Sequence, residues 1–181
     1  PGSVAWAIPQ RTKMTADLAP KPSTTRVLRV ALLGFGTVGT GAYRMLQDNH
    51  EAITRKIGSP VEIVKIGIKD ASKVRDLPAE LFTTDLNSIV DDPNVDVVLE
   101  LIGGTDPAGA LVERAIKNGK HVVTANKELM AKEGSRLVHL AKDRGLDLHY
   151  EAAVGGGITL VQPLKHQLAG NDVIKMMGIL N

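Results

Sequence analysis

The sequence contains no cysteine, which excludes several kinds of protein chemistry at once. Without thiols the chain has no disulfide framework, no thiolate metal site and no cysteine nucleophile. Aromatic residues make up only 3% of the 181 residues, too few for the stacking platforms that hold single-stranded nucleic acid. No run approaches the roughly 18 consecutive apolar residues of a membrane helix. We therefore expect neither nucleic acid nor a membrane as a partner.

The charge is almost balanced, with 22 basic against 20 acidic side chains and a formal net charge of +2. Three basic residues against one acidic residue within residues 1–25 account for that excess. This segment is also rich in proline and shows no sustained hydrophobic period, which predicts a disordered tail. The remaining residues, 26–181, are numerous enough to form one domain with a real core.

From residue 26 onward, strand and helix patterns alternate along the chain. Apolar, β-branched runs that end at glycines are typical of strands buried on both faces of a parallel sheet. Amphipathic stretches closed by glycine or proline indicate the helices between them. The alternation predicts an α/β fold with a doubly wound, mostly parallel sheet. The expected strands are 27–33, 61–68, 95–102, 121–124 and 146–150, and the expected helices are 39–58, 85–90, 107–118 and 127–144.

A glycine-rich turn joins the first expected strand to the first expected helix and matches G-x-G-x-x-G. Gly34 permits a tight turn, Gly36 lets a pyrophosphate approach the backbone, and Gly39 lets the helix pack closely on the strand. This context favours a Rossmann-type dinucleotide-binding domain; the alternative is a tight turn without a ligand. The predicted cofactor-binding residues of this turn are Gly34, Phe35, Gly36, Thr37, Val38 and Gly39.

The loop after the second expected strand bears on which dinucleotide is bound. Asp70 is placed to hold the ribose hydroxyls of NAD, whereas Lys69, Lys73 and Arg75 crowd the same loop. Arginine binds a phosphate with two parallel hydrogen bonds and lysine adds a point charge, so these cations suit the 2′-phosphate of NADP. We favour NADP, with Lys69 and Arg75 as binding residues; NAD and an ordinary solvated turn stay as alternatives.

Three later turns also follow strand ends, where α/β sheets bind their ligands. Gly104 and Thr105 suit a cofactor ribose or the nicotinamide. Lys127 suits a charge-neutralising, substrate-orienting or nicotinamide-adjacent role, and is equally a surface lysine at a helix start. The loop 151–158 contains three consecutive glycines. Such a loop can turn carbonyl oxygens toward a hard cation or can be a flexible crossover.

These motifs together resemble homoserine dehydrogenase, from about residue 26 to residue 181. The resemblance is carried by Leu-Leu-Gly-Phe-Gly-Thr-Val-Gly, Leu-Ile-Gly-Gly-Thr, Thr-Ala-Asn-Lys and Glu-Ala-Ala-Val-Gly-Gly-Gly-Ile, in that order. It implies an NAD(P)-dependent oxidoreductase that interconverts L-homoserine and L-aspartate 4-semialdehyde, in the pathway to threonine, methionine and isoleucine. It also implies a cytoplasmic enzyme that is a homo-oligomer at full length.

The resemblance also implies roles for individual residues. The first motif and the Gly-Gly-Thr turn bind the nucleotide, and Lys127 lies at the nicotinamide as one of two lysines implicated in catalysis. A lysine serves proton transfer when burial or a nearby cation lowers its pKa. The last loop carries a monovalent cation, usually sodium. Carried over by position, its ligands are Glu151 and the carbonyls of Val154, Gly156 and Ile158.

The sequence departs from the family in two places. Thr159 stands where the family has proline, which weakens the cation prediction. The family continues the strand near residue 177 into a substrate and dimerisation domain, whereas this sequence stops at Asn181. We therefore expect a truncated form that binds nucleotide with little or no turnover and exposes apolar surface over residues 154–168 and 173–180.

Two rival interpretations remain beside the enzyme. Aspartate-semialdehyde dehydrogenase shares a similar nucleotide domain, but its acyl-enzyme chemistry needs a cysteine, and the chain has none. The other alternative is a dinucleotide-binding module without catalytic activity.

Overall fold

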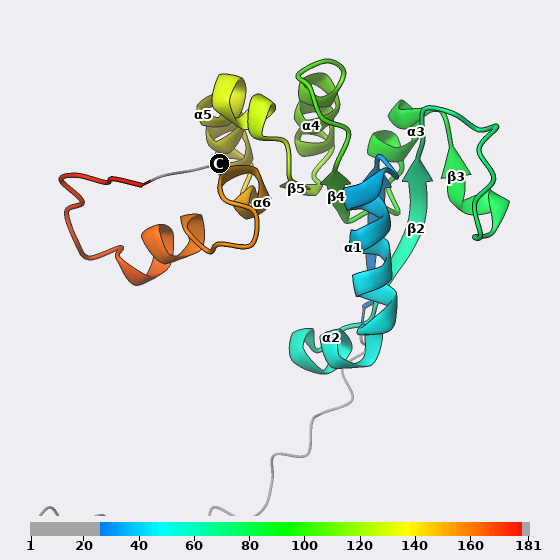
Figure 1. Ribbon diagram of the computed structural model, residues 1–181, viewed down its shortest axis with the longest axis horizontal. Helices are drawn as coiled ribbons and strands as arrows, with labels where there is room; N and C mark the ends of the chain where they lie inside the picture. Colours follow the sequence, from blue (N-terminus) through cyan, green and yellow to red (C-terminus); the bar gives the residue numbers. More distant parts are fainter. Residues whose placement is uncertain (1–25, 179–181) are drawn as a thin grey trace, which may run out of the picture.

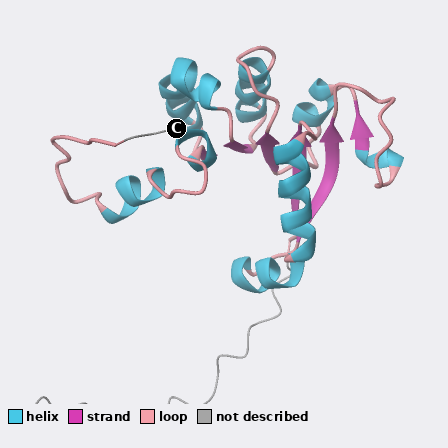
Figure 2. Ribbon diagram, in the orientation of Figure 1, coloured by secondary structure: helices cyan, strands magenta, loops and turns pink. Residues whose placement is uncertain are grey.

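The computed structural model describes residues 26–178, so the predicted disordered tail at residues 1–25 lies outside the described residues. Within that range the strands form one parallel sheet with helices on both faces (Figures 1 and 2). The strands are β1 (Leu28–Leu33), β2 (Val61–Gly67), β3 (Phe82–Thr83), β4 (Val97–Glu100), β5 (His121–Thr124) and β6 (Leu148–His149).

The strand order is β3-β2-β1-β4-β5-β6, and every neighbouring pair is parallel. The chain therefore builds the sheet outward from β1 in one direction and from β4 in the other. This reversal between β1 and β4 confirms the predicted doubly wound, Rossmann-type sheet. It also opens a crevice at the carboxyl ends of these strands, the place where such folds bind ligands.

The helices divide between the two faces of the sheet. In Figure 1, α3 (Leu86–Asp91), α4 (Ala108–Lys117) and α5 (Lys127–Asp143) line one side, and α1 (Thr37–Asp48) crosses the other. Shorter elements complete the fold. They are α2 (His50–Ile57), the 3₁₀ turn η1 (Ala79–Leu81), α6 (Glu151–Val154) and the π-helical turn η2 (Pro163–Gln167).

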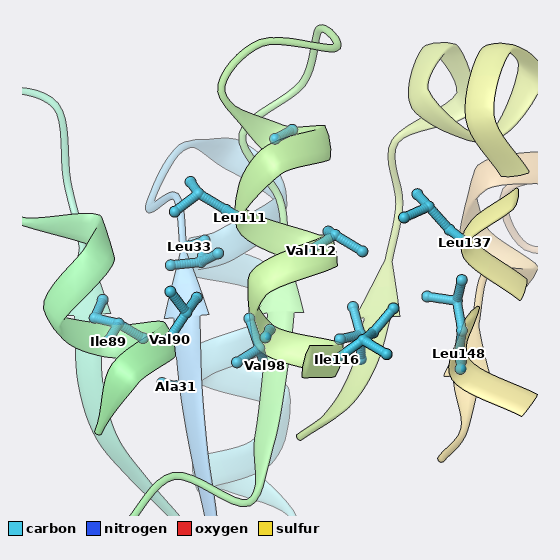
Figure 3. Packing of buried hydrophobic residues seen from close by; sticks show 14 of the residues in the cluster. Ala31, Leu33, Ile89, Val90, Val98, Leu111, Val112, Ile116, Leu137 and Leu148 are labelled. Atoms are coloured by element: carbon cyan, nitrogen blue, oxygen red, sulfur yellow. The ribbon is translucent and has the colours of Figure 1, made fainter. Parts of the chain in front are cut away.

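The core consists of two apolar clusters, one on each face of the sheet. Ala31 and Leu33 of β1 face the cluster beneath α3, α4 and α5 (Figure 3), whereas Val30 and Leu32 face the cluster beneath α1. Because both faces are covered, β1 is apolar from Val30 to Leu33 without alternation, and only the exposed Arg29 near its start is charged. Burying one such side chain fully contributes about 1.5–3 kcal/mol.

The first expected helix, 39–58, is wrong as a single element, because Asn49 divides it into α1 and α2. The Asn49 side-chain amide donates to the carbonyl of Met45 at 2.9 Å, and its backbone N–H bonds to the same oxygen. A side chain that competes for helical carbonyls ends a helix in this way. The sequence patterns also missed β3 and α6, and β4 is shorter than the strand predicted at 95–102.

The stretch from η2 to residue 178 lies beside the sheet, beyond α6 (Figure 1, orange to red). Residues 173–178 form no strand, in contrast to the extended strand expected near residue 177. Large apolar side chains are exposed here, including Ile174 at 97% and Met177 at 82%, which confirms the predicted apolar surface over the described residues. Over residues 26–178, no helix is both long and apolar enough to cross a membrane.

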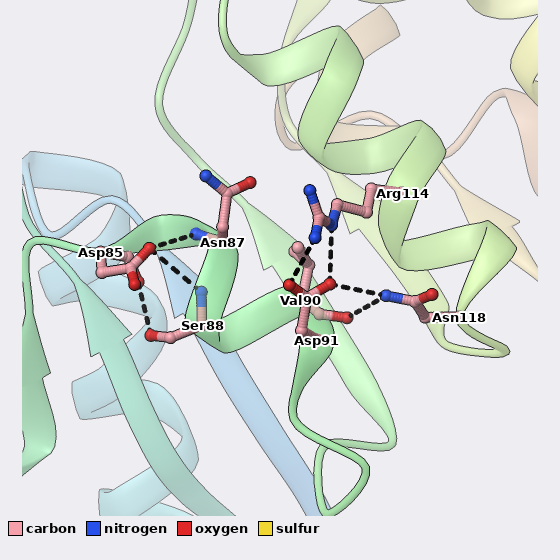
Figure 4. Close-up of polar contacts among 7 residues, drawn as sticks. All are labelled: Asp85, Asn87, Ser88, Val90, Asp91, Arg114 and Asn118. Carbon is pink, nitrogen blue, oxygen red and sulfur yellow. Dashed lines mark hydrogen bonds and ion pairs between the residues drawn. The ribbon is translucent and has the colours of Figure 1, made fainter.

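Polar contacts tie α3 to α4 on one face of the sheet (Figure 4). Asp85 begins α3 by accepting the backbone N–H groups of Asn87 and Ser88, an ordinary N-cap. At the other end of α3, Asp91 accepts two hydrogen bonds from the Arg114 guanidinium, at 2.7 and 2.6 Å. These bonds with Arg114 lower the pKa of Asp91.

Candidate functional site

The glycine-rich turn between β1 and α1 has the backbone geometry predicted for it. Gly34 adopts a positive φ of 105°, and a Cβ there would lie 2.7 Å from the carbonyl oxygen of Leu101. A Cβ on Gly39 would overlap the carbonyl oxygen of Gly34, so α1 packs directly on the turn. A Cβ on Gly36 would meet nothing within 4 Å. The turn therefore has no room for a side chain at Gly34 or Gly39, but it has free space at Gly36.

The N-terminus of α1 has free hydrogen-bonding capacity. Gly36 provides no side-chain cap, and the first turn holds no acidic residue. Thr37 and Val38 are exposed, and the first N–H groups of any helix lack intrahelical partners. Backbone N–H groups and the positive end of the helix dipole together favour an anion such as a pyrophosphate.

An open cleft with a volume of about 1020 Å³ lies at this end of the sheet. Its walls come from the turn after β1, the loop after β2 and the turn after β4, so it straddles the point where the strand order reverses. A pocket of this size accommodates a large organic ligand. It brings together the predicted residues Gly34, Phe35, Gly36, Lys69 and Arg75.

The loop after β2 arranges its charged residues in a definite way. The Asp70 carboxylate accepts the Ser72 hydroxyl at 2.7 Å and the Ser72 backbone N–H at 2.9 Å, and these bonds lower the pKa of Asp70. Arg75 donates to the carbonyls of Lys73 and Asp70, at 2.7 and 2.9 Å, and its guanidinium lies 5.3 Å from the centre of the Phe82 ring. The loop therefore holds Arg75 in place while Asp70 is engaged with its own turn.

A second hollow, of about 430 Å³, lies between the turns that follow β4 and β5 and the glycine loop after β6. Lys127, the first residue of α5, is exposed and lines this hollow. The structure thus brings the three later turns of the sequence analysis together. Of their predicted residues, Gly104, Lys127, Val154 and Gly156 line the hollow, whereas Thr105, Glu151 and Ile158 do not.

The sequence analysis missed a group of buried polar side chains beneath these turns. Glu100 and Thr124 are fully buried, and Asn126 is 6% exposed. Asn126 is the N-cap of α5, where its side chain accepts the N–H of Leu129 at 3.1 Å. The available signal was a carboxylate at the end of an otherwise apolar strand, because a charged residue there is retained inside only with partners.

The structure gives the Glu151 carboxylate a set of partners other than a metal ion. It accepts the backbone N–H groups of Leu160, of Val161 at 2.8 Å and of Gln162 at 3.0 Å. These bonds, chiefly the one from Leu160, lower the pKa of Glu151. A sodium ion suits the carbonyl oxygens of this loop, whereas at the carboxylate it would compete with three N–H donors. The predicted ligand set therefore fits only in part.

Comparison with known proteins agrees with this geometry. Residues 34–151 match the family model described as homoserine dehydrogenase, NAD binding domain. The chain is 45% identical to the homoserine dehydrogenase of Bacillus subtilis over 158 residues, which are 86% of this chain and 36% of that one. It is 42% identical to the Corynebacterium glutamicum enzyme over 153 residues, 84% of this chain and 34% of that one.

Solved structures give the same result. The homoserine dehydrogenase from Thiobacillus denitrificans matches with a TM-score of 0.76 at 44% identity, over 81% of this chain and 34% of that one. The S. aureus enzyme matches with a TM-score of 0.68 at 37% identity, over 72% of this chain and 34% of that one. The chain spans about a third of the length of these relatives. It belongs to the homoserine dehydrogenase family and contains that family's NAD-binding domain.

Proposed function

We propose that the protein takes part in the NAD(P)-dependent interconversion of L-homoserine and L-aspartate 4-semialdehyde, a step toward threonine, methionine and isoleucine. The relatives that support this proposal are homoserine dehydrogenases. The observation that carries it is the open backbone at Gly36, which faces the cleft between two closely packed glycines. A pyrophosphate fits there because only a residue without a side chain leaves room for it.

Different residues of the chain would bind the two halves of the nucleotide and the substrate. The free N–H groups at the start of α1 bind the pyrophosphate, and Gly104 and Thr105 hold the nicotinamide half. A dinucleotide held there would supply the hydride acceptor for oxidation of the alcohol, or the hydride donor for reduction of the aldehyde. Lys127 lines the hollow beside Gly104. Its side chain there would orient the substrate oxygen. As the neutral amine it would take the proton of the alcohol, and as the ammonium it would return a proton to the oxygen in the reverse direction.

NADP is the proposed nucleotide in preference to NAD. The Asp70 carboxylate, which would hold the ribose hydroxyls of NAD, is already bonded to Ser72. Lys69, Lys73 and Arg75 line the same part of the cleft and supply positive charge for a 2′-phosphate. The Phe82 ring beneath Arg75 supports a fixed position of the guanidinium.

The monovalent cation, sodium, remains part of the proposal. Its site would use the carbonyls of Val154, Gly156 and Ile158, of which the first two residues line the second hollow. Glu151 would join in competition with the N–H groups that it now accepts, which would weaken those bonds. We further propose a cytoplasmic protein that forms a homo-oligomer at full length, as the family resemblance implies.

Binding of nucleotides to Gly36→Ala tests the proposal. The added methyl meets no atom of the protein, so the fold should persist with at most about 1 kcal/mol lost at the helix cap. In a fluorescence titration, NADPH should bind at least about tenfold more weakly than to the wild type, or ~1.4 kcal/mol. Gly41→Ala is the matched control, because Gly41 lies in the same helix, where a Cβ also meets nothing within 4 Å.

Three results would count against parts of the proposal. Equal NADPH affinity in Gly36→Ala and the control would contradict the proposed binding of the pyrophosphate at this turn. Tighter binding of NADH than of NADPH by the wild type would transfer the ribose role to Asp70. A wild-type chain that binds neither nucleotide would refute the cofactor proposal altogether.

A further inference from the structure

Three polar side chains are buried where β4 and β5 end. Glu100 and Thr124 have no solvent exposure, and Asn126 is 6% exposed. Polar groups in such positions are costly unless they are hydrogen-bonded, so their partners show what they hold in place. Thr124 and Asn126 belong to the Thr-Ala-Asn-Lys motif, but the sequence assigned a role there only to Lys127, and it assigned none to Glu100.

Glu100 joins the turn after β4 to the neighbouring strand. One carboxylate oxygen accepts the backbone N–H of Ile102 at 2.9 Å and that of Gly103 at 3.4 Å. The other accepts the hydroxyl of Thr124, at the end of β5, at 2.5 Å. A single side chain therefore holds the start of the Gly103–Gly104 turn and connects it to β5.

Asn126 joins the same turn to the start of α5. Its side-chain N–H donates to the carbonyl of Gly104 at 2.6 Å, while its side-chain oxygen caps α5. The hydroxyl of Thr124 accepts the backbone N–H of Asn126 at 3.0 Å. Both glycines of the turn have positive φ, 84° and 71°, and these bonds hold them in that conformation. The turn, the end of β5 and the helix that begins at Lys127 form one connected unit.

This unit lies on one side of the point where the strand order reverses. The basic loop after β2 lies on the other side, where the adenosine phosphate is proposed to bind. A dinucleotide bound across the reversal therefore places its nicotinamide half over the ends of β4 and β5. We propose that Glu100 is a positioning residue for the nicotinamide half, an inference that rests on the proposed nucleotide-binding function.

The variant Glu100→Gln distinguishes a positioning role of the Glu100 hydrogen bonds from a role in which the side chain only fills space. Glutamine has almost the same shape but replaces one acceptor oxygen with an N–H donor. That donor must face either the N–H of Ile102, which then loses its acceptor, or the hydroxyl of Thr124, which must then accept a bond and loses the acceptor of its own hydrogen. In either orientation one buried donor is left without its present partner. The turn should then loosen although no cavity has been created.

The test compares NADPH with 2′-phospho-ADP-ribose, which is the same nucleotide without the nicotinamide ring. In Glu100→Gln, we expect NADPH to bind about tenfold more weakly while 2′-phospho-ADP-ribose changes by less than about twofold. Thr124→Val should show the same selective loss because it keeps the shape and removes the hydroxyl. Thr124→Ser, which keeps the hydroxyl, should restore wild-type NADPH binding.

The outcomes separate this inference from the function on which it rests. Equal weakening of both ligands, or weakening of neither, overturns the positioning role of Glu100. If Glu100→Gln does not fold, the comparison of Thr124→Val with Thr124→Ser decides the question alone, and equal NADPH affinity in that pair overturns the proposal. Failure of the wild-type chain to bind both ligands refutes the proposed nucleotide site, and with it this inference.

Discussion

Gly39→Ala is the perturbation that tests most directly how the glycine turn is built. Gly39 is buried in the first turn of α1, and a Cβ there would overlap the carbonyl oxygen of Gly34. That oxygen is a backbone atom and cannot rotate away, so α1 must shift relative to β1. Overpacking of this kind costs about 1–3 kcal/mol.

Gly41→Ala in the same helix provides the reference for the magnitude. Replacing glycine by alanine within a helix contributes about 0.8–1 kcal/mol in helix propensity at either position. A Cβ on Gly41 meets nothing within 4 Å, so this variant should be more stable than the wild type. The difference between the two variants therefore measures the overlap alone, and we expect Gly41→Ala to be more stable than Gly39→Ala by about 1–3 kcal/mol.

Urea unfolding followed by circular dichroism at 222 nm gives the free energy of unfolding of each variant. A parallel titration should show weaker NADPH binding by Gly39→Ala, because the start of α1 moves away from the turn. Gly41→Ala should bind NADPH as the wild type does. If Gly39→Ala proves as stable as Gly41→Ala, the close contact between α1 and the turn is refuted.

The remaining predictions concern Lys120 and Glu151, two charged side chains that hold backbone groups through several hydrogen bonds. Lys120→Met should lose about 1–3 kcal/mol, because buried Lys120 donates to the carbonyls of Asp92 and Val95. Burial lowers the pKa of Lys120 below its ordinary value of 10.5. Between the lowered pKa and 10.5 the unfolded chain binds more protons than the folded chain, so the free energy of unfolding of the wild type should rise with pH. Urea unfolding across this pH window should show no such rise for Lys120→Met. The pKa of Glu151 is lowered, so the hydrogen bonds that its carboxylate accepts should weaken as the pH falls through that pKa. At neutral pH, Glu151→Gln should speed hydrogen exchange at the Val161 amide, which donates to this carboxylate. Sodium should speed the same exchange in the wild type, and an effect no larger than that of tetramethylammonium would contradict the sodium proposal.

The sequence patterns predicted most of the sheet because its strands are covered on both faces. Four successive apolar residues end β1, two valines form the centre of β5, and glycine or a helix start follows each strand. The patterns failed at short elements and at a helix break. The two-residue strand β3 is too short to show a period, and Asn49 divides α1 from α2 through a local side-chain bond.

The candidate site divides in a similar way. The turn at residues 34–39 was predictable because each glycine lies where a side chain would interfere locally, and the spacing of the glycines identifies these positions. The connection of Glu100 to Thr124 was not predictable, since it joins residues 24 positions apart on neighbouring strands. The partners of Glu151 were also hidden, because they are backbone N–H groups, which every residue except proline carries.

The order of residues was sufficient to predict the alternation of strands and helices, the Rossmann-type class and the place of the glycine turn. Each of these depends on local sterics or on a hydrophobic period that neighbouring residues share. Which strand ends lie side by side became known from the folded chain alone. It is in the fold that Lys127 shares a hollow with Gly104 and that Asp70 bonds to Ser72. Those arrangements depend on contacts between segments and on the direction of each side chain, neither of which a linear pattern contains.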